Sequence, residues 1–402
     1  MIQMLVTLLP TFVCGVLSVE LFFSWRKNYM PAKLWLLIWA ISATLLYSGH
    51  FAYFCRFISL LPLSDSIYTT CNLAVYPLYL IYIYKLTELR TPRLLLALMV
   101  LPILVGCSAA TLYAVMNSDE MALFVNSYLY HDASRGTMTP IVTAQKLLHD
   151  FCKIAFSVEL LLVVFVGRRK IKKYNSMVEQ LYADTEERSL HSINIILLLL
   201  IITSVVSFVI NIIGRTWFSD HYAFLIFPSL TFSALLFAIG WCGLNQDFSV
   251  IDIYKDREAF SNYKENNFLT DVPKQPYMVS VGEDLPIGDF FPDSESIAEL
   301  PSEKLEPLRE QLVEVVEKKQ IFRQHDLKLD ELANIIGTNR TYLLKVMRDG
   351  MGMSFSEYIN RCRIAYALEL MSECPDISKT EIAYRSGFSS KSSFYRNLRL
   401  YS

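Results

Sequence analysis

Seven long apolar runs occupy the first 245 residues of the chain. They lie near residues 4–24, 34–54, 67–84, 94–116, 147–166, 193–213 and 222–244. Each run approaches the ~20 residues that a helix needs to cross ~30 Å of hydrocarbon. Inside lipid every backbone amide needs an internal partner, so helices are the expected structure. A buried soluble core explains one or two such runs but not seven. The sequence therefore predicts a seven-transmembrane helical domain over residues 1–245.

Cationic residues are distributed unequally among the connections between these runs. The connections after the first, third and fifth runs carry twelve Lys or Arg residues. The other connections carry Arg56, Arg135 and Arg215, with Lys146 at the edge of the fifth run. Lys and Arg accumulate in the cytoplasmic connections of membrane proteins. We therefore expect a multi-pass protein of the cell (inner) membrane, with its N-terminus outside and its C-terminal part in the cytoplasm.

The fifth run carries several charged groups. His149, Asp150 and Lys153 lie near its outer end, where we expect them to be solvated at the membrane interface. Glu159 lies deeper. A carboxylate at that depth is costly and usually faces a partner or a cavity. Two interpretations of Glu159 stay open: it is a possible sensing residue for a ligand or a proton, or it is hydrogen-bonded within the bundle as a structural residue.

Residues 246–304 differ in composition from the apolar part. Between residues 250 and 304 there are 12 Asp or Glu residues against 5 Lys or Arg residues, together with five prolines. Low hydrophobic periodicity, excess acid and scattered proline are typical of a flexible tether. We therefore predict an acidic, proline-containing linker over residues 246–304. A small irregular docking segment around residues 278–291 is the alternative.

Two similar patterns follow from residue 305 onward. In the first, Leu329, Leu332 and Ile336 form one apolar helical face, Gly337 marks a tight turn, and a second helix is expected near residues 339–348. In the second pattern, Ile382 and Ala383 face inward, Gly387 makes the turn, and Ser389 and Ser390 supply capping chemistry for the next helix. A longer helix, near 354–372, separates the two. Two helices joined by a glycine turn are typical of a helix-turn-helix unit.

The residues DELANIIG (330–337), SFSEYINRCRIAYALELM (354–371) and EIAYRSGFSSKSSFYR (381–396) occur in this order. This pattern resembles the arabinose-regulator (AraC/XylS) type DNA-binding domain over about residues 308–400. The resemblance implies two helix-turn-helix subdomains bridged by a long helix. It also implies DNA-binding residues, namely Arg340, Thr341 and Lys345 in the first recognition helix and Lys391, Ser392, Tyr395 and Arg396 in the second. The family's usual Gly-x-Thr/Ser-Pro turn and last helix are missing, so we expect a C-terminally short domain over 305–402.

Charge and dimensions agree with DNA binding. Residues 338–402 contain 10 Lys or Arg residues and 6 Asp or Glu residues, whereas the whole chain has a net charge of -2. A connecting helix of ~19 residues is ~28 Å long, and one turn of DNA is ~34 Å. One protomer is therefore expected to place two helices in successive major grooves. Phosphate attraction supplies affinity, and contacts to base edges supply sequence choice.

These features together predict an all-α chain in which a seven-span sensor controls a cytoplasmic, sequence-specific DNA-binding domain. The expected partners are promoter DNA, the lipid bilayer, a possible second copy in a homodimer, an unknown stimulus, and RNA polymerase if the protein is an activator. No catalytic motif or Cys/His metal pattern occurs, so we expect no enzyme activity, cofactor or metal. The alternative is a membrane transporter or scaffold with a vestigial or regulatory DNA-binding appendage.

Overall fold

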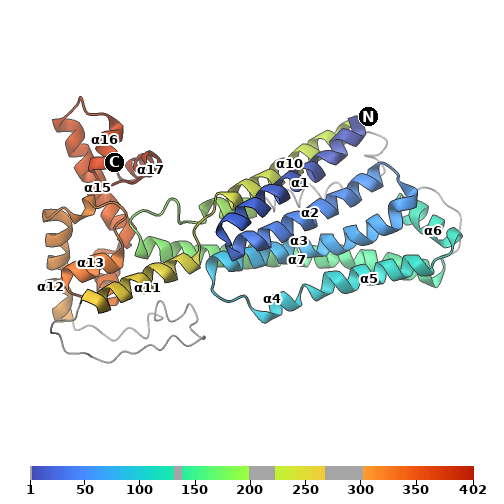
Figure 1. The fold of residues 1–402 in the computed structure, drawn as a ribbon, viewed down its shortest axis with the longest axis horizontal. Coiled ribbons are helices and arrows are strands. Elements are labelled where there is room, and N and C mark those ends of the chain that lie inside the picture. Colours follow the sequence, from blue (N-terminus) through green and yellow to red (C-terminus); the bar gives the residue numbers. More distant parts are fainter. Residues whose placement is uncertain (1, 131–137, 199–221, 268–301) are drawn as a thin grey trace. The chain divides into compact units, whose positions relative to one another are not determined.

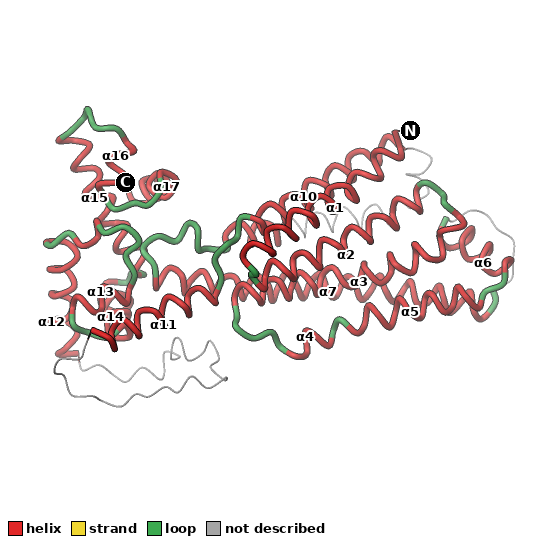
Figure 2. Tube along the Cα trace, in the orientation of Figure 1, coloured by secondary structure: helices red, strands yellow, loops and turns green. Residues whose placement is uncertain are grey.

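The computed structural model describes residues 2–130, 138–198, 222–267 and 302–402. Within these residues every regular element is a helix, apart from one isolated antiparallel bridge between Tyr182 and Lys328 (Figure 2). The predicted all-α class is confirmed for this part of the chain. The chain divides into two compact units. Unit 1 contains residues 1–172 and 190–249, and unit 2 contains residues 173–189 and 250–402.

Unit 1 is a bundle of long helices (Figure 1). Its helices are α1 (Ile2–Asn28), α2 (Pro31–Phe54), α3 (Leu61–Thr87), α4 (Arg93–Ala97), α5 (Val100–Val115), α6 (Ser118–Phe124), α7 (Pro140–Leu181) and α10 (Ile226–Leu244). The last residues of α7 belong to unit 2. Residues 191–198 are also helical. Helix α2 packs along both α1 and α3, while α10 packs against α1 and α5 against α3.

Among the described residues, four helical stretches are long and apolar enough to cross a membrane. They are Met4–Asn28, Pro31–Phe54, Arg93–Val115 and Ile226–Leu244, and they correspond to the first, second, fourth and seventh apolar runs. The third run lies in α3, whose tyrosines lower its mean hydropathy. The fifth lies in α7, where Asp150, Lys153 and Glu159 interrupt the apolar sequence. Most of the sixth run, 193–213, lies outside the described residues.

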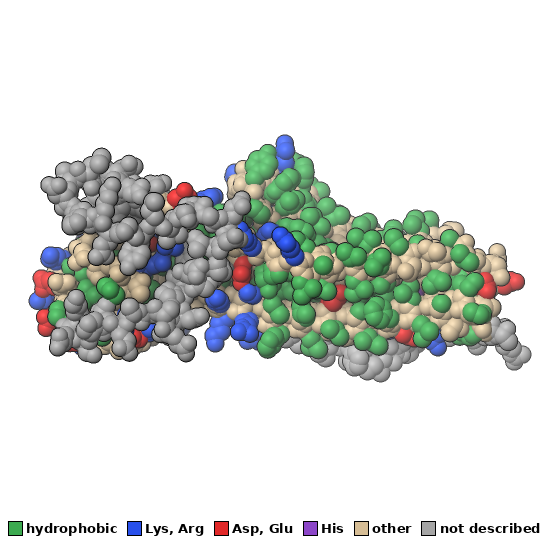
Figure 3. Space-filling view, turned by 90° about the horizontal axis from the view of Figure 1, so that it is seen from below, with side chains coloured by type: hydrophobic (Ala, Val, Ile, Leu, Met, Phe, Trp, Pro, Cys, Tyr) green, Lys and Arg blue, Asp and Glu red, His purple; other side chains and the backbone are tan. Residues whose placement is uncertain are grey.

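Large apolar side chains cover the outside of unit 1. Phe12, Phe23, Leu104, Phe227 and Trp241 are each more than half exposed. Figure 3 shows hydrophobic side chains spread over the visible face of these helices. Soluble monomers rarely expose apolar patches of this extent, and such surfaces normally contact lipid or another protein. The burial pattern therefore agrees with helices that face hydrocarbon.

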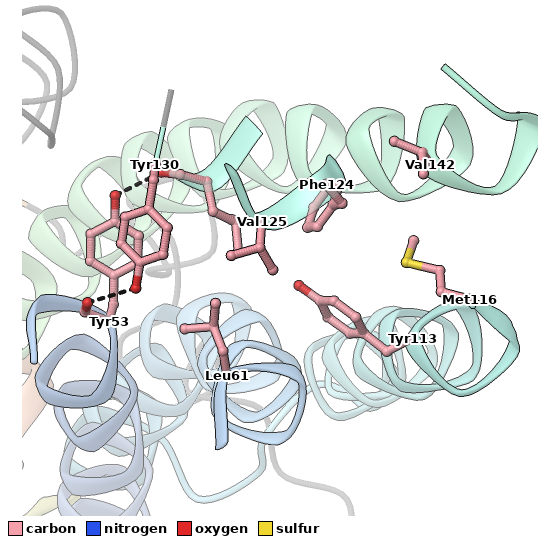
Figure 4. Packing of buried hydrophobic residues seen from close by; sticks show 9 residues of the cluster. Tyr53, Leu61, Tyr113, Met116, Phe124, Val125, Tyr130 and Val142 are labelled. Atoms are coloured by element: carbon pink, nitrogen blue, oxygen red, sulfur yellow. Dashed lines mark hydrogen bonds between the residues drawn. The ribbon is translucent and has the colours of Figure 1, made fainter. Parts of the chain in front are cut away.

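A cluster of aromatic and aliphatic side chains closes one end of the bundle (Figure 4). The rings of Tyr53 and Tyr130 stack with 4.8 Å between their centroids. The Tyr53 hydroxyl donates to the carbonyl of Leu129 at 2.7 Å, and the Tyr130 hydroxyl donates to the carbonyl of Tyr53 at 2.9 Å. These bonds satisfy buried hydroxyl groups. They also fasten the chain after α6 to the end of α2.

His149 is placed differently from our expectation. It is 8% exposed rather than solvated, and its Nε2 lies 2.7 Å from Oδ2 of Asp65 in α3. The Tyr113 hydroxyl of α5 donates to the same carboxylate oxygen at 2.8 Å. Asp150 stays closer to the surface, where it accepts hydrogen bonds from Tyr128 and Lys153. Burial of His149 is possible because the Asp65 carboxylate of α3 and the Gln145 carbonyl of α7 both lie within hydrogen-bond distance of its ring nitrogens. The contact with α3 is not revealed by helical spacing within α7.

Unit 2 consists of shorter helices. They are α11 (Val250–Asn267), α12 (Ser302–Val313), α13 (Leu329–Ile336), α14 (Arg340–Lys345), α15 (Phe355–Glu373), α16 (Lys379–Arg385) and α17 (Lys391–Tyr401). Helix α11 falls within the predicted linker. It forms where Val250 and Ile253, one turn apart, are both buried. The rest of the predicted linker, from residue 268 to 301, lies outside the described residues.

The close approach of α3 and α5 yields a stability prediction. A Cβ atom on Gly106 of α5 would overlap the side chain of Thr70, whose hydroxyl is held by the Ser66 carbonyl at 2.8 Å. Small residues allow this spacing between membrane helices. Gly106→Ala is therefore expected to destabilise the protein by about 1–3 kcal/mol, measured as a lower thermal midpoint in detergent.

Gly15→Ala is the matched control for that substitution. A Cβ on Gly15 in α1 meets no atom within 4 Å. It is expected to leave the midpoint unchanged or to raise it, because alanine favours helix over glycine. Equal midpoints for Gly106→Ala and the parent protein would contradict the described packing of α3 against α5.

Candidate nucleic-acid interface

The first helix-turn-helix unit consists of α13 and α14. Gly337 ends α13 with a φ of 77°, a left-handed conformation that glycine adopts readily. The Asn339 side chain then caps α14 by accepting a hydrogen bond from the backbone N–H of Tyr342 at 2.8 Å. Leu332 and Leu343 are fully buried between the two helices. The predicted turn is confirmed, although α14 is shorter than expected and continues as a π-helical turn, Val346–Gly350.

The second helix-turn-helix unit, formed by α16 and α17, repeats this arrangement. Gly387 has a φ of 90°, and a Cβ there would lie 2.7 Å from the Phe322 carbonyl oxygen, so both the conformation and the space favour glycine. The Ser390 hydroxyl caps α17 by accepting from the N–H of Ser393 at 3.1 Å. Phe388 and Phe394 pack edge to face within one buried cluster. This confirms the predicted turn and the predicted cap.

Helix α15 connects the two helix-turn-helix units. It spans Phe355–Glu373, within a residue of the predicted range at each end, and Ser354 caps its start. Its 19 residues correspond to a length of ~28 Å. Phe355 and Ile359 are buried in the first half of α15, and Ile364 and Ala367 belong to the buried cluster of the second helix-turn-helix unit. A single helix therefore joins the two helix-turn-helix units.

The predicted DNA-contacting residues lie on the two recognition helices. In α14, Arg340, Thr341 and Lys345 are partly exposed. In α17, Lys391, Ser392 and Tyr395 are exposed, while Arg396 is partly covered. The structure therefore distributes these seven residues between two helix surfaces rather than gathering them in one cluster. Arg340 also lines a shallow crevice with Tyr182 and Asp256.

Arg363 is a buried residue that supports the candidate site and that our sequence reasoning missed. Its side chain on α15 is fully buried. Its guanidinium donates to the carbonyls of Phe322 and Gln324, each at 2.8 Å, and to Oδ1 of Asp184 at 3.2 Å. Burial lowers the pKa of Arg363, and the Asp184 carboxylate opposes this effect. A sequence signal did exist, because Arg363 lies one helical turn from both Ile359 and Ala367, on the apolar face.

Residues 182–188 form a second missed element, which we call segment 182–188. It lies in the connection after the fifth apolar run, yet it packs within unit 2. The Ala183 carbonyl accepts hydrogen bonds from Ser356 and Asn360 of α15, at 3.0 and 2.9 Å. The Asp184 carboxylate accepts a further bond from Ser389 at 2.8 Å. The segment therefore contacts both the bridging helix and the second helix-turn-helix unit.

Glu159 lies in α7 of unit 1, away from these helices in the chain. Its carboxylate oxygen Oε2 is buried and has no hydrogen-bond partner among the described residues. A buried carboxylate oxygen without a partner is costly. The described residues therefore assign no structural partner to Oε2 of Glu159.

The burial of Arg363 yields a second stability prediction. Arg363→Met leaves Asp184 and two carbonyls without their donor, which typically costs about 3–5 kcal/mol for a buried ion pair. We expect a much lower denaturant midpoint for unit 2. Arg361→Met is the matched control, since Arg361 is exposed on the same helix, where it pairs with Glu357 and lies over the Tyr401 ring. Similar midpoints for the two variants would contradict the buried role of Arg363.

Comparison with known proteins assigns the C-terminal part. Residues 332–401 match the family described as helix-turn-helix domain. Over 77 residues, 19% of this chain, the sequence is 32% identical to a probable transcription factor, PqrA, of Proteus vulgaris, and covers 62% of that protein. Over 74 residues it is 35% identical to HTH-type transcriptional regulators of Staphylococcus aureus strains MSSA476 and MRSA252, of which it covers a tenth.

No solved structure matches the chain. The family match lies in the C-terminal part of the chain, and the chain spans only a tenth of the length of the Staphylococcus aureus regulators. The relatives that match are named as transcriptional regulators and a probable transcription factor. The C-terminal part of the chain, residues 332–401, therefore carries a helix-turn-helix domain of the kind found in transcription regulators.

Proposed function

We propose that the protein is a membrane-embedded transcription regulator. A seven-span sensor over residues 1–245 is joined by a linker, 246–304, to a cytoplasmic double helix-turn-helix domain, 305–402. The observation that carries this proposal is the presence, in one chain, of two helix-turn-helix units and four helices able to cross a membrane. The names of the relatives, which include transcriptional regulators and a transcription factor, support the DNA-binding half.

DNA recognition in this proposal uses both recognition helices. Helix α15 holds them so that each enters one of two successive major grooves. Lys345 and Arg396 contact base edges, because their long cationic side chains reach the acceptors of guanine. Arg340, Thr341, Lys391, Ser392 and Tyr395 supply phosphate or further base contacts. The buried Arg363 holds the scaffold and does not touch DNA.

Signal reception belongs to the membrane half in this proposal. The excess of Lys and Arg in the connections after the first, third and fifth apolar runs supports a cytoplasmic location for these connections and for the C-terminal part. Glu159 is the proposed sensing residue, supported by its carboxylate oxygen that lacks a described partner within a span. The signal then changes how well the DNA-binding domains of a homodimer engage promoter DNA. As an activator, the protein would also contact RNA polymerase.

DNA binding is tested with the full chain in lipid nanodiscs. The probe is a duplex of the region upstream of the protein's own coding sequence, titrated at several salt concentrations. We expect selective binding, and Lys345→Ala or Arg396→Ala should weaken it by about 1–3 kcal/mol and reduce selectivity over a scrambled duplex. Lys318→Ala is the control, because Lys318 is exposed and paired with Glu314, away from the recognition helices in the chain.

Two results would contradict this function. Equal losses for Lys318→Ala and Arg396→Ala would mean that only overall charge matters. Weak, unselective binding by the folded protein would favour a membrane transporter or scaffold with a vestigial or regulatory DNA-binding appendage.

Membrane topology is tested with reporter fusions in cells. Alkaline phosphatase, which is active only outside, is expected to be active after residues 60 and 120. Green fluorescent protein, which matures only inside, is expected to fluoresce after residues 90 and 245. The physical reason is the excess of Lys and Arg in the connections assigned to the cytoplasm. A phosphatase-active fusion after residue 245 would rule out DNA binding in the cytoplasm by the region that follows.

A further inference from the structure

Segment 182–188 places acidic groups at the start of the second recognition helix. The Ser389 hydroxyl donates to Oδ2 of Asp184 at 2.8 Å, and the Ser390 hydroxyl donates to Oε2 of Glu186 at 2.9 Å. Ser390 is the residue that caps α17. Two carboxylates therefore lie against the N-terminal end of this helix.

This position has a specific meaning for a DNA-binding helix. The N-terminus of a helix attracts anions, because its first N–H groups are unpaired and the helix dipole is positive there. In protein–DNA complexes, DNA phosphates accept hydrogen bonds from such helix ends and from serine hydroxyls. Asp184 and Glu186 therefore present carboxylate oxygens to the kind of groups that contact phosphates.

The same segment also engages the proposed base-reading side chain of α17. The Arg396 guanidinium donates to the Thr185 hydroxyl at 3.3 Å. An arginine directed at segment 182–188 cannot at the same time extend toward a guanine in the major groove. At the other recognition helix, Tyr182 lines one crevice with Arg340, the first residue of α14. The segment thus reaches residues of both proposed recognition helices.

Other contacts hold segment 182–188 in place. The Ala183 N–H donates to the Leu327 carbonyl at 3.1 Å, and Arg188 pairs with Asp326 at 2.7 Å. The Tyr182 hydroxyl donates to Asp256 of α11 at 2.8 Å. The segment begins directly after α7 and precedes the sixth apolar run. It therefore lies on the covalent path between two predicted spans, where a change in the membrane bundle reaches it first.

We propose that segment 182–188 is an internal competitor of DNA, which occupies phosphate-contacting positions of the second recognition helix and keeps the domain closed until a signal withdraws it. This inference rests on the proposed DNA-binding function and adds its regulation. Withdrawal exposes Ser389, Ser390 and Arg396 together. DNA and the segment then bind the same groups in exclusive states, so each weakens the binding of the other.

The test uses variants that spare the buried Arg363–Asp184 pair. Glu186 is partly exposed and bonds Ser390, while Thr185 bonds Arg396; neither touches Arg363. Glu186→Gln and Thr185→Ala should therefore fold normally and open the domain. Glu187→Gln is the matched control, because Glu187 is the exposed neighbour and carries the same charge. All four proteins are the full chain in nanodiscs.

The first readout is affinity for the upstream duplex at fixed salt. Glu186→Gln and Thr185→Ala are expected to bind about five- to tenfold more tightly than the parent protein, and Glu187→Gln as the parent does. The second readout is amide hydrogen exchange in the parent protein. Exchange at Ala183, whose N–H group donates to the Leu327 carbonyl outside the segment in the closed form, is expected to rise when DNA is added.

The outcomes separate the inference from the function on which it rests. Equal affinity of all four proteins, or unchanged exchange on DNA binding, would overturn the inference while leaving a DNA-binding regulator intact. Equal tightening by Glu186→Gln and Glu187→Gln would also overturn it, since loss of any nearby negative charge would then suffice. Binding of the duplex by none of the four proteins would contradict the DNA-binding function itself and the inference with it.

Discussion

Unit 2 is organised around one buried charge, the guanidinium of Arg363. This group stays protonated at any physiological pH, so its burial is tolerated only where its nitrogens have hydrogen-bond acceptors. Two carbonyls of the turn at residues 322–324 and the Asp184 carboxylate provide them. That turn also positions the second helix-turn-helix unit, because Gly387 packs directly against the backbone of Phe322 and Arg323. The charge therefore links the bridging helix, the second turn and segment 182–188.

Much of the DNA-binding domain could be predicted from the sequence, because its determinants are local. Gly337 and Gly387 mark turns that need a left-handed residue, and Ser354 and Ser390 cap the helices that follow them. Segment 182–188 could not be predicted in the same way. Its side-chain hydrogen-bond partners outside the segment lie 74 or more residues away in the chain, and no short-range pattern encodes such pairing. An arginine on the apolar face of a helix was the one available sign that a distant acid must exist.

In the apolar part of the chain, residues 1–245, hydropathy alone identifies some helices better than others. Among the described residues, mean hydropathy selects four helices, and it is weaker for α3 and α7, which carry tyrosines and charged residues. Those two helices are joined by a polar interaction, the Asp65–His149 contact. Helices that exchange polar contacts need less apolar sequence to be stable within a bundle. The polar and charged residues that lower the hydropathy of α3 and α7 therefore also give these two helices specific partners.

The central claim is that an intact membrane protein holds promoter DNA. It is tested most directly by crosslinking cells that express the full chain, floating their membranes and quantifying the DNA recovered with the protein. The account predicts that the region upstream of the protein's own gene is enriched in the membrane fraction over unrelated DNA, and that Arg396→Ala removes this enrichment. Recovery of that region only with a soluble fragment lacking residues 1–245, or no enrichment at all, would contradict it.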